Sequence, residues 1–158
     1  MRIAGIVRDS IVNGPGIRDV VFFQGCSKHC KGCHNPDTWN YIGGCHRFFS
    51  DVVNELAESS NDVTISGGEP LDQFEDLLGL CKQLKKQGKN IWVYTGNVVD
   101  PKSRAYRQLA QYVDVIVDGR FVEELKDSEL LFRGSSNQRL INLPVSVRRG
   151  KIVEWEDK

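Results

Sequence analysis

The chain has 158 residues, of which 40% are hydrophobic and 27% are charged, a composition typical of a folded globular protein rather than a disordered or membrane one. Lysine plus arginine and aspartate plus glutamate each number 21, so no net charge favours nucleic acid or an acidic lipid surface as a partner. The length suits one hydrophobic core, and we expect a single domain over residues 1–158.

The first part of the chain predicts two strands followed by a loop rich in cysteine. Strands are expected at residues 2–7 and 18–23, because both stretches are rich in β-branched and other apolar residues. Between them, Asn13-Gly14-Pro15-Gly16 predicts a tight turn. The loop at residues 24–35 then carries the cysteines.

The middle of the chain alternates between helical and strand patterns. Helices are expected at residues 49–58, 72–87 and 103–111, with Gly88 ending the second of them. Strands are expected at 62–66, 90–95 and 113–117. The part at residues 119–158 is less regular, with a polar loop at 133–137 and two short strands predicted near 139–142 and 145–147.

This alternation predicts parallel strands joined by right-handed helical crossovers. The expected fold class is α/β: an open, mostly parallel sheet or part of a (β/α) barrel, with helices on one side. In such folds the functional groups gather where the strands end, at their carboxyl edge.

The N-terminus and the cysteine count both bear on the cellular compartment. Arg2, Arg8 and Asp9 interrupt the first apolar stretch before it reaches the length of a signal peptide, and no run approaches the ~20 apolar residues of a membrane span. We therefore expect a cytoplasmic protein, in which the five cysteines are metal ligands or core residues rather than disulfides.

The cysteine loop has the spacing C-x3-C-x2-C, formed by Cys26, Cys30 and Cys33. Three thiolates on one loop can hold three corners of an iron–sulfur cube, since soft sulfur ligands suit this metal. The fourth iron would then be open to a substrate. Two alternatives remain: structural zinc, with His29, His34 or Cys45 as a fourth ligand, and an electron carrier whose cluster Cys45 completes. Cys81 falls on the apolar face of its predicted helix and is expected in the core.

Two predicted strands end in glycine. Residues 62–66 lead into Gly67-Gly68-Glu69-Pro70, and residues 90–95 lead into Gly96. Glycine at the end of a strand allows a ligand to approach the backbone, although a plain turn with Pro70 opening the next helix explains the first pattern equally well. Both glycine segments are expected at the same sheet edge as the cysteine loop.

Together, the cysteine motif and Gly-Gly-Glu-Pro resemble the radical S-adenosylmethionine superfamily. More narrowly, the chain resembles the family of glycyl radical enzyme activases that act on anaerobic ribonucleoside-triphosphate reductase. The stretches that carry this resemblance run from about residue 12 to about residue 142, and they are Val12-Asn13-Gly14-Pro15-Gly16, Cys33-His34-Asn35-Pro36 with Thr38-Trp39, Ile91-Trp92-Val93-Tyr94-Thr95-Gly96, Val117-Asp118-Gly119-Arg120-Phe121 and Arg133-Gly134-Ser135-Ser136-Asn137-Gln138.

The resemblance implies one [4Fe-4S] cluster on the three cysteines, with S-adenosylmethionine bound to the fourth iron. The segment from Gly67 to Pro70 would contact the amino group of that cofactor, and Thr95 and Gly96 would lie near its ribose or carboxylate. Gly32, Cys33 and His34 would lie along its adenine, although many superfamily members have an aromatic residue where this chain has Gly32.

The implied reaction is reductive cleavage of S-adenosylmethionine to a 5'-deoxyadenosyl radical, which takes hydrogen from a glycine of the large reductase subunit. An external electron donor such as a flavodoxin is the other implied partner, and residues 133–138 are a candidate docking segment. Activation of another glycyl radical enzyme, such as pyruvate formate-lyase, and a non-catalytic electron carrier are the alternative functions.

Overall fold

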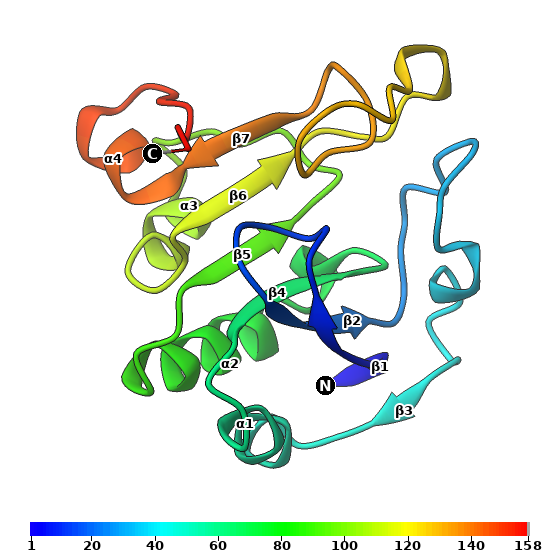
Figure 1. Ribbon diagram of the computed structural model, residues 1–158, viewed down its shortest axis with the longest axis vertical. Helices are drawn as coiled ribbons and strands as arrows, with labels where there is room; N and C mark the ends of the chain where they lie inside the picture. Colours follow the sequence, from blue (N-terminus) through cyan, green and yellow to red (C-terminus); the bar gives the residue numbers. More distant parts are fainter. Residues whose placement is uncertain (158) are drawn as a thin grey trace.

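The computed structural model describes residues 1–157 and places them around one open sheet with the strand order β3-β1-β2-β4-β5-β6-β7 (Figure 1). The four central strands are parallel, whereas β1, β3 and β7 run antiparallel to their neighbours. The bounds of the strands are β1 (Arg2–Ser10), β2 (Arg18–Phe23), β3 (Cys45–His46), β4 (Asp62–Gly67), β5 (Ile91–Tyr94), β6 (Val115–Asp118) and β7 (Arg139–Asn142). The parallel centre confirms the prediction drawn from the strand and helix alternation.

In residues 1–157, four α-helices pack on one face of this sheet, and the placement of helices on one side was expected. They contribute to the same hydrophobic core as alternate residues of the strands, for example Val63 and Ile65 of β4. The helices are α1 (Phe49–Ala57), α2 (Phe74–Lys86), α3 (Arg104–Leu109) and α4 (Leu143–Arg149), and short 3₁₀ helices lie at η1 (Pro36–Thr38), η2 (Pro70–Gln73) and η3 (Glu123–Leu125). None of the helices in the described residues has the length and apolarity to cross a membrane.

Helix α2 shows why the sequence forms a helix here. Its first turn carries Glu75 and Asp76 and its last turn Lys85 and Lys86, so charges of both signs complement the helix dipole. Four residues on one side are buried, namely Leu77, Leu80, Cys81 and Leu84. The chain leaves the helix through Gly88, which has φ +77°.

The short strand predicted at residues 145–147 is wrong, because these residues belong to α4. The valines at 145 and 147 favour strand, yet local capping decides the outcome. The side chain of Asn142 accepts a hydrogen bond from the backbone of Val145, Pro144 occupies the first turn, and Gly150 ends the helix in the left-handed conformation. The strand predicted at 139–142 is confirmed as β7.

The face of the sheet opposite the helices holds a buried arginine. Arg18 is 1% exposed, and its guanidinium donates to the hydroxyl of Thr64 at 2.8 Å and to the carbonyls of Val63 and Asn90, both at 2.9 Å. Its Cζ also lies 5.6 Å from the centre of the Trp92 ring. Burial lowers the pKa of Arg18 to about 10, so the side chain stays charged at neutral pH. Within residues 1–157, Arg18 forms no ion pair with a carboxylate, so carbonyl and hydroxyl oxygens stabilise its charge.

Replacing Arg18 with lysine is expected to lower the free energy of unfolding by about 1–3 kcal/mol, because one ammonium group cannot reach the acceptors that the planar guanidinium serves. Urea unfolding of the metal-free protein measures this loss. Arg107→Lys is the matched control, since Arg107 is exposed on α3, and it should change stability by less than about 0.5 kcal/mol. Equal stability of Arg18→Lys and the unmodified protein would contradict this reading of the buried charge.

Candidate metal centre

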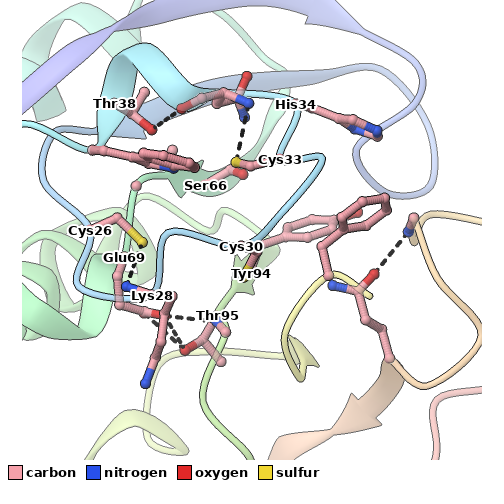
Figure 2. A pocket seen from close by; sticks show the side chains of 18 of the residues that line it. Cys26, Lys28, Cys30, Cys33, His34, Thr38, Ser66, Glu69, Tyr94 and Thr95 are labelled. Carbon is pink, nitrogen blue, oxygen red and sulfur yellow. Dashed lines mark hydrogen bonds between the residues drawn. The ribbon is translucent and has the colours of Figure 1, made fainter. Parts of the chain in front are cut away.

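A pocket of about 210 Å³ opens at the carboxyl ends of the central strands, and the three motif cysteines line it (Figure 2). Figure 2 shows the side chains of Cys26, Cys30 and Cys33 around one space, with Glu69 and Thr95 below it in this view. The predicted site residues that line the pocket are Cys26, Cys30, Cys33, His34, Gly67, Gly68, Glu69, Thr95 and Gly96. The structure thus brings together the cysteine loop and both glycine segments, which the sequence placed at one sheet edge.

Two of the predicted site residues do not line this pocket. Gly32 has φ +77° and faces Phe121 and Glu123, each of which would lie 3.2 Å from an added Cβ. Pro70 is buried at the first position of η2 and starts that short helix. The contacts of Gly32 and Pro70 with the cofactor, which the resemblance implies, stay predictions.

The entry to the cysteine loop is fixed by the segment around η1. The backbone N–H of Gly25 donates to the carbonyl of Thr38 at 2.6 Å, and that of Cys26 donates to the carbonyl of Trp39 at 3.1 Å. Gly25 has φ +104°, and an added Cβ would lie 2.3 Å from the ring of Tyr41. Only glycine fits at this position, so the chain turns sharply just before the first cysteine.

Backbone N–H groups point at two of the sulfurs. Cys26 Sγ accepts from the N–H of Lys28 at 3.4 Å, and Cys33 Sγ accepts from the N–H of Asn35 at 3.3 Å. Burial raises the pKa of the Cys26 thiol, and the hydrogen bond from Lys28 acts against that shift. A buried thiol of this kind is a poor free nucleophile, whereas a bound metal would replace its proton.

These residues fit an iron–sulfur cluster. The donor set is soft sulfur, two of the sulfurs already accept N–H donors of the type that stabilise thiolates, and the space beside them is large enough for more than one metal ion. In residues 1–157, no three histidine, cysteine, aspartate or glutamate side chains are gathered around a position for a single metal ion.

The remaining candidates for a fourth protein ligand lie in different places. His34 lines the pocket beside Phe121, whereas His29 stacks on Trp39 outside the pocket lining. Cys45 is exposed in β3, where it pairs with Ile3, and it does not line the pocket. Cys81 is fully buried in α2, where burial raises its pKa, so its expected place in the core is confirmed.

Replacing Cys45 with serine is expected to leave iron and sulfide binding unchanged, because its thiol is exposed on an edge strand and lies outside the pocket. Iron and acid-labile sulfide measured after anaerobic reconstitution should match the unmodified protein within error. A Cys45→Ser protein that loses its cluster would show that Cys45 is a ligand, as the electron-carrier alternative requires.

Gly67, the last residue of β4, and Gly68, which follows it, are needed for packing of the chain itself. A Cβ on Gly67 would lie 2.3 Å from backbone atoms of Phe23, and one on Gly68 would lie 2.2 Å from the carbonyl oxygen of Gly25. In this close contact, the N–H of Gly68 donates to Phe23 at 2.9 Å and that of Glu69 donates to Gly25 at 2.8 Å. The glycines therefore hold the end of β4 against the start of the cysteine loop.

Glu69 joins the two glycine segments. Its carboxylate is 1% exposed and accepts from the N–H of Gly96 at 2.7 Å, the hydroxyl of Thr95 at 2.9 and 3.0 Å and the N–H of Leu71 at 3.0 Å. Burial raises the pKa of Glu69, while the hydrogen bonds from Leu71 and Gly96 lower it. Glu69 fixes the turn after β5 beside the turn after β4.

The pocket also includes residues that were not among the predicted site residues, namely Asn13, Lys28, Asn35, Thr38, Trp39, Ser66, Tyr94, Gly119, Phe121, Gly134 and Gln138. Most of them belong to the stretches that carry the family resemblance, so the resemblance could have identified them as site residues. Lys28 and Ser66 lie next to the cysteines and glycines in sequence and could have been found from that proximity.

The polar loop at residues 133–138 forms part of the pocket wall. The side-chain oxygen of Gln138 accepts from the N–H groups of Gly134 and Ser135 at 2.9 and 3.1 Å, and a guanidinium nitrogen of Arg133 donates to the Gln138 carbonyl at 2.6 Å. Asn137 is exposed and donates to the carbonyl of Arg120 at 2.8 Å. Much of this loop's polarity is thus used in holding its own shape.

Comparison with known proteins matches the sequence of this chain to a family. Residues 12–141 match the model of the 4Fe-4S single cluster domain. The chain is 39% identical to the anaerobic ribonucleoside-triphosphate reductase-activating protein of Escherichia coli K12, over 81% of the chain and 90% of that protein. Proteins of the same name from Haemophilus influenzae and from phage T4 are 36% and 38% identical, over 81% and 82% of the chain and 89% and 86% of those proteins.

The matched segment contains the cysteine loop, both glycine segments and the loop at 133–138, so the similarity extends over the whole pocket. The chain therefore belongs to the family of the anaerobic ribonucleoside-triphosphate reductase-activating proteins.

Proposed function

We propose that the chain activates anaerobic ribonucleoside-triphosphate reductase, using one [4Fe-4S] cluster bound by Cys26, Cys30 and Cys33 together with S-adenosylmethionine. The name of its relatives and the match to a 4Fe-4S single cluster domain support the partner and the cluster. The observation that carries the proposal is that three cysteines and two glycine-rich strand ends share one pocket. The other cysteines of the chain lie elsewhere, which leaves one corner of the cluster for the cofactor.

The bound groups would supply radical chemistry. One electron from the cluster would break the bond from sulfur to the 5' carbon of S-adenosylmethionine, giving methionine and a radical that takes a hydrogen atom from a glycine of the reductase. The cysteine loop holds the cluster at the carboxyl edge of the sheet. The arrangement of the parallel strands and of this loop supports a radical S-adenosylmethionine fold as the finer assignment.

The turn after β4 is suited to the amino group of the cofactor. The N–H groups of Gly68 and Glu69 donate to Phe23 and Gly25, and the carbonyl of Glu69 accepts from Asp72, so the carbonyl oxygen of Gly68 is the backbone group proposed to contact the ligand. Carbonyl oxygens accept hydrogen bonds from an amino group, as the contact with methionine requires. The Glu69 carboxylate acts as a positioning group, since it holds Thr95 and Gly96 at the neighbouring strand end.

Activation also needs an electron and access for the partner. An external donor such as a flavodoxin is the proposed source of the electron. The pocket is open to the surface, and the loop at 133–138, which contributes Gly134 and Gln138 to its wall, is the proposed contact with the reductase. Ser136 and Asn137 are exposed residues of this loop and are proposed for this contact, whereas Arg133 donates a hydrogen bond within the loop.

The test is activation of the purified reductase. The chain is reconstituted anaerobically with iron and sulfide, reduced, and mixed with S-adenosylmethionine and the large reductase subunit. We expect release of 5'-deoxyadenosine and the electron paramagnetic resonance (EPR) signal of a glycyl radical on the reductase. An intact cluster that releases no 5'-deoxyadenosine would instead indicate an electron carrier, and cleavage without a radical on this reductase would indicate another glycyl radical enzyme as the partner.

A further inference from the structure

The indole N–H of Trp39 is buried without a hydrogen-bond partner. In the described part of the chain, Trp39 Nε1 and Arg133 Nε are the buried side-chain nitrogen or oxygen atoms in this situation. Buried N–H groups in folded proteins are almost always paired, because leaving one unpaired costs free energy. Trp39 lines the pocket of the three cysteines, so a group bound in that pocket is the natural partner.

The position of Trp39 is fixed relative to the first cysteine. Its backbone carbonyl accepts a hydrogen bond from the N–H of Cys26 at 3.1 Å, and its backbone N–H donates to the carbonyl of Pro36 at 3.2 Å. The imidazole of His29 stacks on its ring, with the ring centres 4.6 Å apart and the planes 9° from parallel. The cysteine loop therefore holds the indole from its backbone and from one face.

The surroundings of the indole indicate what the bound group is. Two sulfurs of this loop, those of Cys26 and Cys33, accept backbone N–H groups. An iron–sulfur cluster beside them adds anionic sulfide, which is an acceptor for a further N–H. The backbone carbonyl proposed to contact the amino group of S-adenosylmethionine lies instead at Gly68, in the turn after β4.

We propose that Trp39 donates its indole N–H to a sulfur of the cluster held by Cys26, Cys30 and Cys33 and thereby raises the reduction potential of that cluster. This inference rests on the cluster-binding part of the proposed function. Reduction adds negative charge to the cluster, and an N–H donor to sulfur stabilises the more negative state. Trp39 would thus make the cluster easier to reduce before it meets its substrate.

The experiment compares midpoint potentials of reconstituted protein, with no S-adenosylmethionine present, by EPR-monitored redox titration. Trp39→Phe keeps an aromatic ring and removes the N–H. We expect the equilibrium constant for reduction of its cluster to fall about tenfold, which lowers the midpoint potential by ~59 mV for one electron. Trp155→Phe is the control, since Trp155 packs on Trp92 away from the pocket, and its potential should be unchanged.

Several results would overturn the inference: an unchanged potential in Trp39→Phe, equal shifts in both variants, or a shift that needs S-adenosylmethionine. If Trp39→Phe fails to hold the cluster, the unmodified protein labelled with ¹⁵N in tryptophan gives the answer. Pulsed EPR of its reduced cluster should show coupling to one indole nitrogen, and absence of that coupling would contradict the hydrogen bond. Absence of a cluster from the unmodified protein would refute the proposed function as well, whereas a normal cluster with no indole effect would refute this inference alone.

Discussion

Replacing Cys30 with serine is expected to abolish both stable cluster binding and cleavage of S-adenosylmethionine. Cys30 lies at the middle of the motif and lines the pocket, and its backbone carbonyl accepts a hydrogen bond from the N–H of Cys33 at 3.1 Å. Serine keeps the backbone bond but removes the soft sulfur, and two thiolates cannot retain a cluster that has one open corner already. Iron content, the visible absorption of the cluster and release of 5'-deoxyadenosine measure the loss.

The fold of the Cys30→Ser protein should be unaffected, because this side chain is outside the hydrophobic core. Circular dichroism and urea unfolding of the metal-free protein provide that check, and Cys45→Ser is the matched thiol control. Retention of a full [4Fe-4S] cluster by Cys30→Ser would exclude the proposed ligand set. Loss of the cluster in both variants would mean that four cysteines of the chain take part.

Replacing Gly68 with alanine is expected to lower the free energy of unfolding by about 3 kcal/mol, at the upper end of the overpacking range. The added Cβ would lie 2.2 Å from the carbonyl oxygen of Gly25, and this neighbour is backbone that cannot rotate away. The hydrogen bond from the N–H of Glu69 to the carbonyl of Gly25, 2.8 Å long, would break as the turn after β4 and the start of the cysteine loop move apart. Because Gly25 precedes Cys26, cluster binding should weaken together with stability.

Gly5→Ala is the control for Gly68→Ala. Gly5 lies in β1, and an added Cβ there meets nothing within 4 Å, so the substitution should be nearly neutral. Urea unfolding of the two metal-free variants and of the unmodified protein gives the comparison. A Gly68→Ala protein as stable as Gly5→Ala would show that the turn after β4 accommodates a side chain, against the close packing described above.

Much of the fold could be predicted from the chain alone, because hydrophobic periodicity and glycine breaks are local signals. Residues 18–23 were predicted as a strand and form β2 with the same bounds, and α1 begins at Phe49 as predicted. The two-residue strand β3 was missed, since so short an edge strand depends on its partner β1 rather than on its own sequence. Helix α4 was missed because capping by Asn142 outweighed the strand preference of its valines.

The site was predicted less completely than the fold, since it is built from segments far apart in sequence. The spacing of the cysteines and the strand order were enough to bring Cys26, Gly68 and Gly96 to one pocket. The burial of Arg18 was not foreseeable, because a charged residue at the start of a strand is normally exposed and its acceptors come from β4 and Asn90. For the same reason, the packing role of Gly67 and Gly68 emerged only when β2 was placed beside β4.

The proposed function depends on one cluster iron that has no protein ligand and binds S-adenosylmethionine directly. Electron–nuclear double resonance of the reduced protein, with the cofactor carrying ¹⁵N in its amino group, tests this dependence. The predicted result is a ¹⁵N coupling of the size expected for nitrogen bound to the cluster. An intact cluster whose spectrum shows no such coupling when the cofactor is present would contradict the account.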